Sequence, residues 1–193
     1  MAARAPRRLV VGISGASGVI YGIRLLEVLR DLEVETHLVM SRAAEITLAH
    51  ETDLKLASVR ALATHCHAPD NIAAGISSGS FRAMGMVIAP CSIRTMSEIA
   101  TGVTAGLMSR AADVALKERR RLVLMVRETP LHLGHLQTMT RLAEIGAIIA
   151  PPVPAFYPRP QTVAELVDHS VGRVLDLFDL DAGILRRWKD SEG

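Results

Sequence analysis

Residues 7–29 read RRLVVGISGASGVIYGIRLLEVL. The apolar run over residues 9–13 is typical of a buried strand, and the glycines at 12, 15 and 18 indicate a tight turn. From about Gly18 to Asp31 the apolar residues recur with a helical period. A buried strand that leads through a glycine turn into a helix is the opening unit of an open α/β sheet.

The rest of the chain repeats this alternation of strands and helices. Further strands are predicted over 34–41, 84–92, 121–128 and 147–157, and helices over 42–51, 95–102, 107–120, 135–146 and 162–178. Thr162 is the expected N-cap of the last helix, with Glu165 at the spacing of a capping box. Residues 64–80 are expected to form a loop. The pattern predicts an α/β protein with an open parallel sheet and right-handed crossovers.

Composition narrows the class of protein. The chain has 193 residues, of which 49% are hydrophobic and 3% aromatic, a balance that suits parallel strands between helices. A net charge of +2 favours neither nucleic acid nor membrane as a partner, and two cysteines are too few for a disulfide framework. We expect a cytoplasmic protein with a basic N-terminal tail over 1–8, a single domain over 9–178 and a C-terminal tail over 179–193.

In an open α/β sheet, ligands bind beyond the carboxyl ends of the strands. Small and polar residues gather there in this sequence, where each apolar run stops. The predicted strand ends are 14–18, 41–42, 90–92, 127–128 and 156–157. We expect the functional site at this edge of the sheet.

The glycine turn GISGASG fits several phosphate-binding motifs poorly. Its spacing is G-x-x-G-x-x-G, whereas dinucleotide folds use G-x-G-x-x-G with an acidic residue after the second strand, where this chain has Ser41 and Arg42. No lysine follows, so a Walker A loop is excluded, and no serine stands in G-x-S-x-G. Two interpretations stay open, a site for a phosphate monoester and a turn that needs glycine only for packing.

Other charged groups also allow two interpretations. Arg110 and Lys117 lie seven residues apart on one helix, roughly 10 Å, which suits either an anion clamp or a solvated face. Glu128 ends a strand as a candidate general acid or as one half of a salt bridge. The histidines of HCH (65–67) and HLGH (132–135) match no recognised zinc spacing, so no metal site is expected.

Several motifs in order resemble one family. GISGASG, LVMSRAAEITLAHET, SSGSF, PCSIRTMSEIATG, SRAADVALKERR, RETP and PPVPAFY together resemble the UbiX-like flavin prenyltransferases, a family that includes proteins labelled as components of phenolic acid decarboxylases. The resemblance runs from about Leu9 to Phe178. It implies an α/β fold of the flavoprotein type, a Rossmann-like three-layer αβα sandwich with a mainly parallel sheet. It further implies a metal-independent transferase that binds FMN and joins a dimethylallyl group, from dimethylallyl phosphate or diphosphate, to N5 and C6 of the flavin. It also implies homododecamers with sites between subunits, and prenylated FMN as the product for a UbiD-type decarboxylase.

The resemblance carries roles to individual positions. FMN contacts are implied for Gly15, Ala16, Ser17, Gly18, Ser41, Ser92, Thr95 and Arg127. A small-residue loop beside the flavin is implied for Ser78, Gly79 and Ser80. Binding of the prenyl phosphate is implied for Arg110, Lys117, Tyr157 and Arg173, and the acidic residues of the site are Glu51 and Glu128.

The sequence departs from the family pattern at three places. Ile72 stands where many members have a tryptophan, Gln137 replaces a glutamate, and Val126 replaces a proline. Three other functions remain as alternatives: FMN-dependent decarboxylation of the related cysteine decarboxylases, a non-catalytic flavin carrier, and a nicotinamide oxidoreductase. The decarboxylases rely on an active-site histidine, and no histidine stands near the glycine turn or the first three strand ends.

Overall fold

The computed structural model describes residues 7–188. The strands are β1 (Arg8–Ile13), β2 (Glu35–Met40), β3 (His65–His67), β4 (Gly85–Cys91), β5 (Arg121–Val126) and β6 (Ala147–Ile149). The helices are α1 (Val19–Asp31), α2 (Arg42–Glu51), α3 (Leu56–Arg60), α4 (Ile93–Thr101), α5 (Leu107–Lys117), α6 (Leu133–Glu144) and α7 (Val163–Asp176), with a 3-10 turn η1 (Gly75–Ser77).

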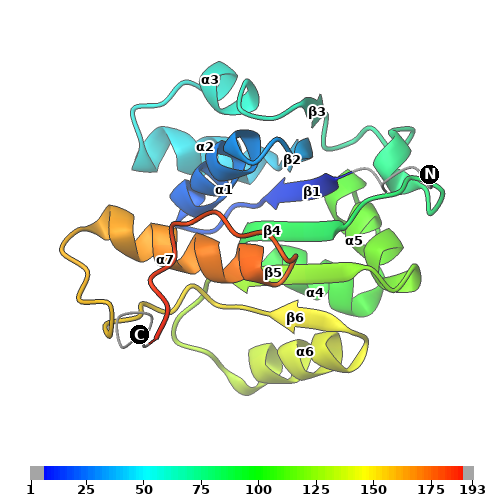
Figure 1. The fold of residues 1–193 in the computed structure, drawn as a ribbon. Helices are drawn as coiled ribbons and strands as arrows, with labels where there is room; N and C mark the ends of the chain where they lie inside the picture. Colours follow the sequence, from blue (N-terminus) through cyan, green and yellow to red (C-terminus); the bar gives the residue numbers. More distant parts are fainter. Residues whose placement is uncertain (1–6, 189–193) are drawn as a thin grey trace, which may run out of the picture.

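The strands form one parallel sheet in the order β3-β2-β1-β4-β5-β6 (Figure 1). In such a sheet the chain order reverses between β1 and β4, which is where ligands bind in doubly wound folds. The expected Rossmann-like αβα sandwich with a parallel sheet is confirmed.

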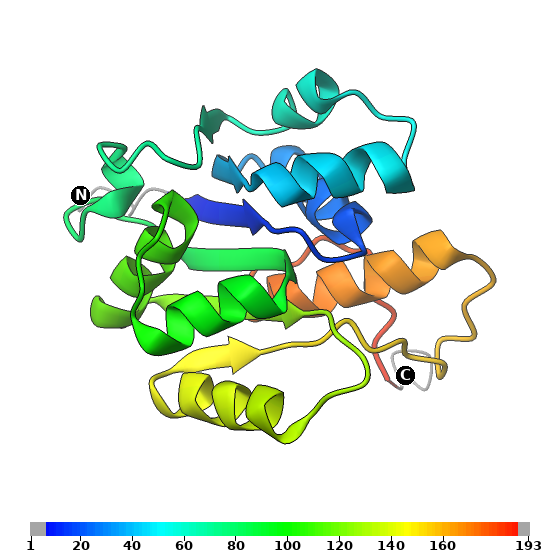
Figure 2. The same ribbon diagram turned by 180° about the vertical axis from the view of Figure 1, so that it is seen from behind.

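Two apolar cores hold the three layers together. Side chains from one face of the sheet pack with α1 and α7, including the buried Leu26, Val171 and Phe178. The other face packs with α4, α5 and α6 through residues such as Met96 and Leu142. Figure 2 shows the sheet from behind, with α4, α5 and α6 on the side away from α7. The strand interiors are buried on both faces, as expected for parallel strands between helices.

Two expectations on local structure need correction. Residues 64–80, expected to be a loop, contain the short strand β3 and the turn η1. Strand β3 forms because the triplet His65–His67 pairs with β2, although its sequence lacks an apolar strand pattern. The strand expected over 147–157 stops at Ile149, ahead of a proline-rich segment over 151–160.

The expected N-cap of α7 is confirmed. The Thr162 hydroxyl accepts a hydrogen bond from the N–H of Glu165, but the Glu165 carboxylate accepts from the N–H of Gln161 rather than of Thr162. The reciprocal half of the capping box is therefore shifted by one residue.

The expected tails fall partly outside the described residues. Of the basic tail over 1–8, residues 1–6 are not described, and Arg8 already belongs to β1. Of the tail over 179–193, residues 179–188 are described and pack against the domain. Leu180 is buried in the α7 core, and Arg187 forms an ion pair with Asp176 of α7 at 2.8 Å.

Candidate functional site

A cavity of about 700 Å³ opens at the carboxyl end of the sheet, beside the crossover point. It lies between the end of β1 and the first turns of α2, α4 and α5. Its lining combines hydroxyl groups with charged side chains of both signs. It includes Gly15, Ser41, Arg42, Glu45, Arg60, Asp70, Ser92, Arg94, Thr95, Glu98 and Ser109. The volume is in the range of sites for small molecules and cofactors. Four of the eight residues expected to contact FMN, namely Gly15, Ser41, Ser92 and Thr95, meet in this cavity.

Two helices begin at the cavity wall with serine caps. The Ser41 hydroxyl accepts the N–H of Ala44 at 3.1 Å, and the Ser92 hydroxyl accepts the N–H of Thr95 at 3.3 Å. The first N–H groups of a helix attract anions, both by hydrogen bonding and through the helix dipole. The N-terminal ends of α2 and α4 therefore give this cavity two anion-binding walls.

Ser14 is structural. Its side chain is buried, donates to the carbonyl oxygen of Pro90 at 2.8 Å and accepts the N–H of Ser92 at 2.7 Å. It thus joins the end of β1 to the end of β4 directly beneath the cavity. This link fixes the position of the α4 cap.

The glycine turn is explained by packing and by backbone conformation. A Cβ on Gly15 would stand 2.2 Å from the Cβ of Ala43, so only glycine lets α2 approach the turn this closely. Gly18 caps α1 with a φ of +98°, which a residue with a side chain rarely adopts. Packing and backbone conformation therefore account for glycine at these two positions.

The N-terminus of α1 is already occupied by a carboxylate of the chain itself. Glu51, at the end of α2, accepts from the N–H of Gly18 at 2.9 and 3.0 Å and from the N–H of Val19 at 3.0 Å. Burial raises the pKa of Glu51, but hydrogen bonds from Ser17, Gly18 and Val19 and the nearby charge of Arg127 outweigh it and lower the pKa below the usual value. These N–H groups are engaged, which speaks against a phosphate in the turn itself.

Arg127 and Glu128 follow β5 at the same edge of the sheet and are both exposed. The backbone N–H of Arg127 donates to the carbonyl of Cys91, and its charge acts on both Glu51 and Tyr21. The Glu128 carboxylate accepts the N–H of Thr129 at 2.9 Å. The three charged residues expected at this edge, Glu51, Arg127 and Glu128, are thus all placed there.

Tyr157 lies beside α7 and Arg173 belongs to its last turn, and together they form what we call the α7 patch. The Tyr157 hydroxyl is 2.9 Å from Nε2 of His169 and donates to the carbonyl of Arg186 at 3.2 Å. Arg173 stands one turn after His169, where it pairs with Asp176 at 2.8 Å and lines a hollow of about 240 Å³ together with His169. Burial, and then the charge of Arg173, lower the pKa of His169. His169 was not among the residues expected in the site, because its only signal in the sequence is its position four residues before Arg173.

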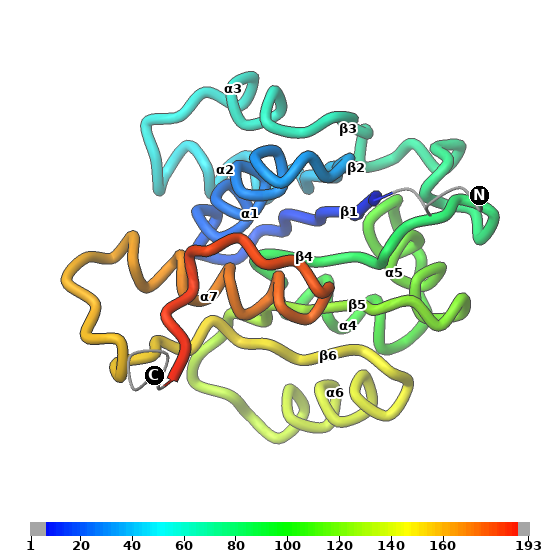
Figure 3. Tube along the Cα trace, in the orientation of Figure 1, coloured from blue at the N-terminus to red at the C-terminus, as the bar shows by residue number. Residues whose placement is uncertain are grey.

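Ser78, Gly79, Ser80, Arg110 and Lys117 gather along α5, and we call them the α5 patch. The Arg110 guanidinium donates to the carbonyl of Ser77 at 3.1 Å, and a Cβ on Gly79 would stand 2.8 Å from Nζ of Lys117. Arg120 holds the loop through the carbonyls of Gly79 and Phe81. Figure 3 shows the trace from β3 running past α5 before it enters β4.

The α5 patch and the α7 patch cannot meet within one chain. Helix α7 packs on one face of the sheet and α5 on the other. The cations expected to surround one phosphate, Arg110 and Lys117 on α5 and Arg173 with Tyr157 at α7, are therefore separated by the sheet. A single described chain holds two halves of the expected donor site.

The comparisons with known proteins agree with one another. The Flavoprotein family matches residues 2–184. The flavin prenyltransferase UbiX of Escherichia coli K12 is 61% identical over 188 residues, which cover 96% of this chain and 100% of that protein. The flavin prenyltransferase UbiX of Thauera aromatica is 56% identical over 96% of this chain and 95% of that protein.

Among residues 7–188 no helix has the length and apolar character needed to cross a membrane.

Solved structures extend the likeness to the backbone. AnUbiX (PadA1), solved with FMN and dimethylallyl pyrophosphate, has a TM-score of 0.94 and 54% identity over 95% of this chain and 98% of that one. A dodecameric FMN-dependent UbiX-like decarboxylase from Escherichia coli O157:H7 has a TM-score of 0.92 and 49% identity over 94% of this chain and 99% of that one. Cypemycin decarboxylase, with 16% identity and a TM-score of 0.63, shares the fold alone. A full-length match at this identity, together with the sheet order and the cavity at its crossover, places the chain in the UbiX flavin prenyltransferase family.

Proposed function

We propose that this protein transfers a dimethylallyl group from dimethylallyl phosphate or diphosphate to N5 and C6 of reduced FMN. The observation that carries the proposal is a cavity of about 700 Å³ at the crossover of the sheet, with hydroxyl groups, arginines and two helix N-termini in its wall. The product, prenylated FMN, would serve a UbiD-type decarboxylase. Reduced FMN supplies the two nucleophilic atoms, and the protein supplies binding sites and proton carriers.

FMN fits the cavity by size and by its donor set. Its phosphate monoester suits the N-termini of α2 and α4, where Ser41, Ser92 and Thr95 present hydroxyl groups. Arg42 adds positive charge at the same wall, where Arg60 is paired with Glu45 at 2.8 Å. We place the phosphate here rather than in the glycine turn, because Glu51 already binds the N–H groups at the start of α1. Gly15, Ala16, Ser17 and Gly18 then contribute wall and backbone contacts near the flavin, with Arg127 beside them.

The prenyl phosphate requires two chains. We infer that the α7 patch of one subunit, with Tyr157 and Arg173, faces the α5 patch of another, with Arg110, Lys117 and the loop Ser78–Ser80. Together they supply three cations and a phenol, which stabilise the negative charge that grows on the phosphate as the carbon–oxygen bond breaks. Because the patches lie on opposite faces of one chain, assembly would create the site.

Exposed apolar side chains support self-association. Leu133 and Leu136 on α6 are 69% and 47% exposed, and Val153, Phe156 and Val163 between β6 and α7 are 71%, 73% and 74% exposed. A subunit interface would remove these side chains from water, which favours association. The UbiX-like decarboxylase from Escherichia coli O157:H7 is dodecameric, and we propose the same homododecamer here.

The two acidic residues have different environments. Glu51 is fixed by backbone and hydroxyl donors and has a lowered pKa, which suits an ionised group that holds neighbouring atoms in place. Glu128 is exposed at the edge of the sheet, where its carboxylate accepts the N–H of Thr129, and we assign the proton-transfer role to Glu128. Closing the site between subunits would keep water away from an allylic cation.

The alternatives are weaker. The cysteine decarboxylases share only the fold, and a flavin carrier would need no second set of anion-binding residues. We further propose that residues 9–178 form the flavin-binding domain and that the protein acts in the cytoplasm, in keeping with its two free cysteines, Cys66 and Cys91.

The decisive test is incubation with reduced FMN and either dimethylallyl phosphate or dimethylallyl diphosphate. We expect a flavin heavier by one prenyl unit by mass spectrometry, and unchanged FMN with both donors would refute the function. Glu128→Gln should slow product formation by about 10²- to 10⁴-fold while FMN stays bound. Glu144→Gln, at an exposed position of α6, is the matched control and should leave the rate unchanged. Full activity of Glu128→Gln would show that the acid is misassigned.

A further inference from the structure

A cluster of four ionisable side chains lies at the amino end of the sheet, away from the cavity. Glu35 and His37 of β2 are two residues apart and point to the same face, and His65 of β3 stands opposite His37 in the register. His67, two residues after His65, extends the same face. Parallel pairing has thus brought together groups that lie about thirty positions apart in the sequence, which a search for local zinc motifs does not detect.

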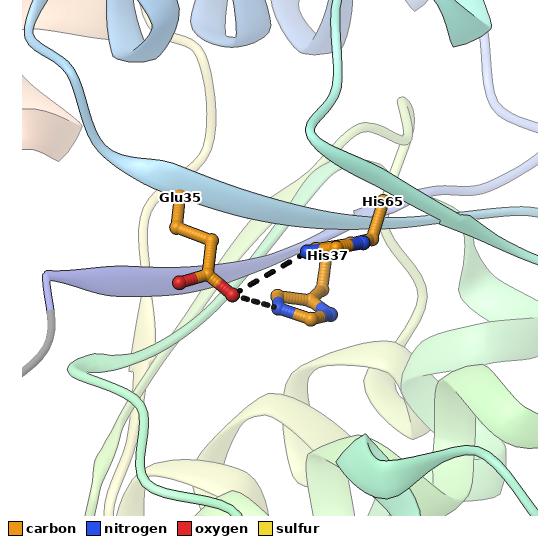
Figure 4. Close-up of side chains that lie close together, drawn as sticks. All are labelled: Glu35, His37 and His65. Atoms are coloured by element: carbon orange, nitrogen blue, oxygen red, sulfur yellow. Dashed lines mark hydrogen bonds and ion pairs between the residues drawn. The ribbon is translucent and has the colours of Figure 1, made fainter.

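The distances in this cluster are those of a metal site. The carboxylate oxygen Oε1 of Glu35 lies 3.1 Å from Nε2 of His37 and 3.5 Å from Nε2 of His65, as Figure 4 shows. All three ligand atoms lie within 4.8 Å of one another. A tetrahedral ion with bonds of about 2.0–2.1 Å holds its ligand atoms roughly 3.3 Å apart, so the two shorter separations already match.

We propose that Glu35, His37 and His65 bind one divalent transition-metal ion of the zinc type. Two imidazole nitrogens and a carboxylate oxygen are a donor set suited to Zn²⁺ and Co²⁺, and unsuited to Mg²⁺ or Ca²⁺, which prefer oxygen ligands. The side chains of Glu35 and His65 are 29% and 51% exposed, which leaves an entry path and a fourth position for water.

The groups around these ligands orient them correctly. Arg8 donates to the other carboxylate oxygen of Glu35 at 2.8 Å, which leaves Oε1 for the metal. Nδ1 of His37 is 3.0 Å from Nε2 of His67. When Nδ1–H donates to His67, the lone pair of His37 sits on Nε2 and faces the ion, the arrangement that metal-bound histidines adopt.

A bound ion would also act on the loop of the α5 patch. The ring of Phe81, directly after Ser80, packs edge-on against His37 with 4.7 Å between the centroids. Phe81 also lies under the guanidinium of Arg8. An ion that fixes His37 would therefore restrict Phe81, which directly follows the loop Ser78–Ser80. It would also link the three-residue strand β3 to β2 through the side chains of His65 and His37.

The test uses the full-length protein without a histidine tag, stripped of metal with a chelator. Titration with Co²⁺, followed by visible absorption, and with Zn²⁺, followed by calorimetry, should show one ion per chain. His65→Gln removes one ligand at an exposed position and should weaken binding at least about tenfold. His50→Gln, an exposed histidine of α2, is the matched control and should bind as the unchanged protein does.

The outcomes separate cleanly. Binding of one ion per chain, with an affinity that His65→Gln lowers and His50→Gln leaves unchanged, supports the site. Absence of saturable binding, or equal binding by the unchanged protein and His65→Gln, overturns it. Thermal unfolding of His65→Gln without metal confirms that the variant is folded. Added Zn²⁺ should raise the melting temperature of the unchanged protein and not that of the variant.

Discussion

The division of the prenyl phosphate site between subunits can be tested by mixing inactive variants. Lys117→Ala removes a cation of the α5 patch, and Arg173→Ala removes one of the α7 patch. Each side chain is about half exposed and each is paired only locally, so both variants should fold. Loss of one charge aimed at the leaving phosphate should lower the rate by about 10²- to 10³-fold, as loss of one oxyanion donor does.

The magnitude of rescue follows from the positions of the patches. If each site takes its α7 patch from one chain and its α5 patch from another, subunits mixed at random in equal amounts form about a quarter of their sites from two intact patches. Co-expressing Lys117→Ala with Arg173→Ala should therefore restore about a quarter of the full rate. A site within one chain would give no rescue, because every chain carries one defect.

A second mixture serves as the control. Combining the unchanged protein with the double variant should also give about a quarter of the full rate when sites are shared, but about a half when each chain holds its own site. The assay is prenylated flavin formed per minute, detected by mass spectrometry, on co-purified assemblies. No rescue in the first mixture together with half activity in the second would refute the arrangement.

Three further changes test the carboxyl edge of the sheet. Gly15→Ala places a Cβ 2.2 Å from Ala43 and should cost about 1–3 kcal/mol in the free energy of unfolding while displacing α2, so that purified protein carries less flavin by absorbance. Ser14→Ala leaves the N–H of Ser92 without its partner and should cost about 1–3 kcal/mol, measured by urea unfolding. Because the pKa of Glu51 is lowered in the native state, its ionised form stabilises the fold at neutral pH, and that contribution disappears as the pH falls through the native pKa. When the pH is lowered from neutral to acid, the melting temperature of Glu51→Gln should therefore fall by less than that of the unchanged protein.

These changes have matched controls. Gly75→Ala meets Phe81 only at an ordinary contact distance of 3.4 Å and should leave flavin content unchanged. Ser97→Ala, partly exposed on α4, should alter urea unfolding little. Equal stability of Gly15→Ala and Gly75→Ala, or of Ser14→Ala and Ser97→Ala, would contradict the packing and hydrogen-bonding arguments. If the melting temperatures of Glu51→Gln and of the unchanged protein fall by the same amount as the pH is lowered, the argument from the lowered pKa of Glu51 is contradicted.

The fold was predictable because its signals are regular. The strands β1, β2, β4 and β5 are apolar runs bounded by polar residues, and the helices between them show a clear period. Strand β3 was not predicted because His65, Cys66 and His67 form a strand only through pairing with β2. Tertiary pairing overrides local propensity most easily in such short segments.

The location of several candidate residues at the carboxyl edge of the sheet was predictable, but their arrangement was not. Ser41, Ser92 and Arg127 follow from the rule that ligands bind at strand ends. The sequence does not show that Glu51 returns from the end of α2 to the start of α1, nor that Lys117 and Arg173 lie on opposite faces. Those relations depend on how helices pack after the strands have paired.

The carboxylate of Glu51 at the start of α1 has a consequence for cofactor choice. The strand order of this sheet is the one on which many proteins hold nicotinamide dinucleotides, and there the pyrophosphate rests on the first N–H groups of the first helix. In this protein an internal acid occupies those donors and would repel a second negative charge. Discrimination against dinucleotides is thus built into the last residue of α2, whatever the spacing of the glycines.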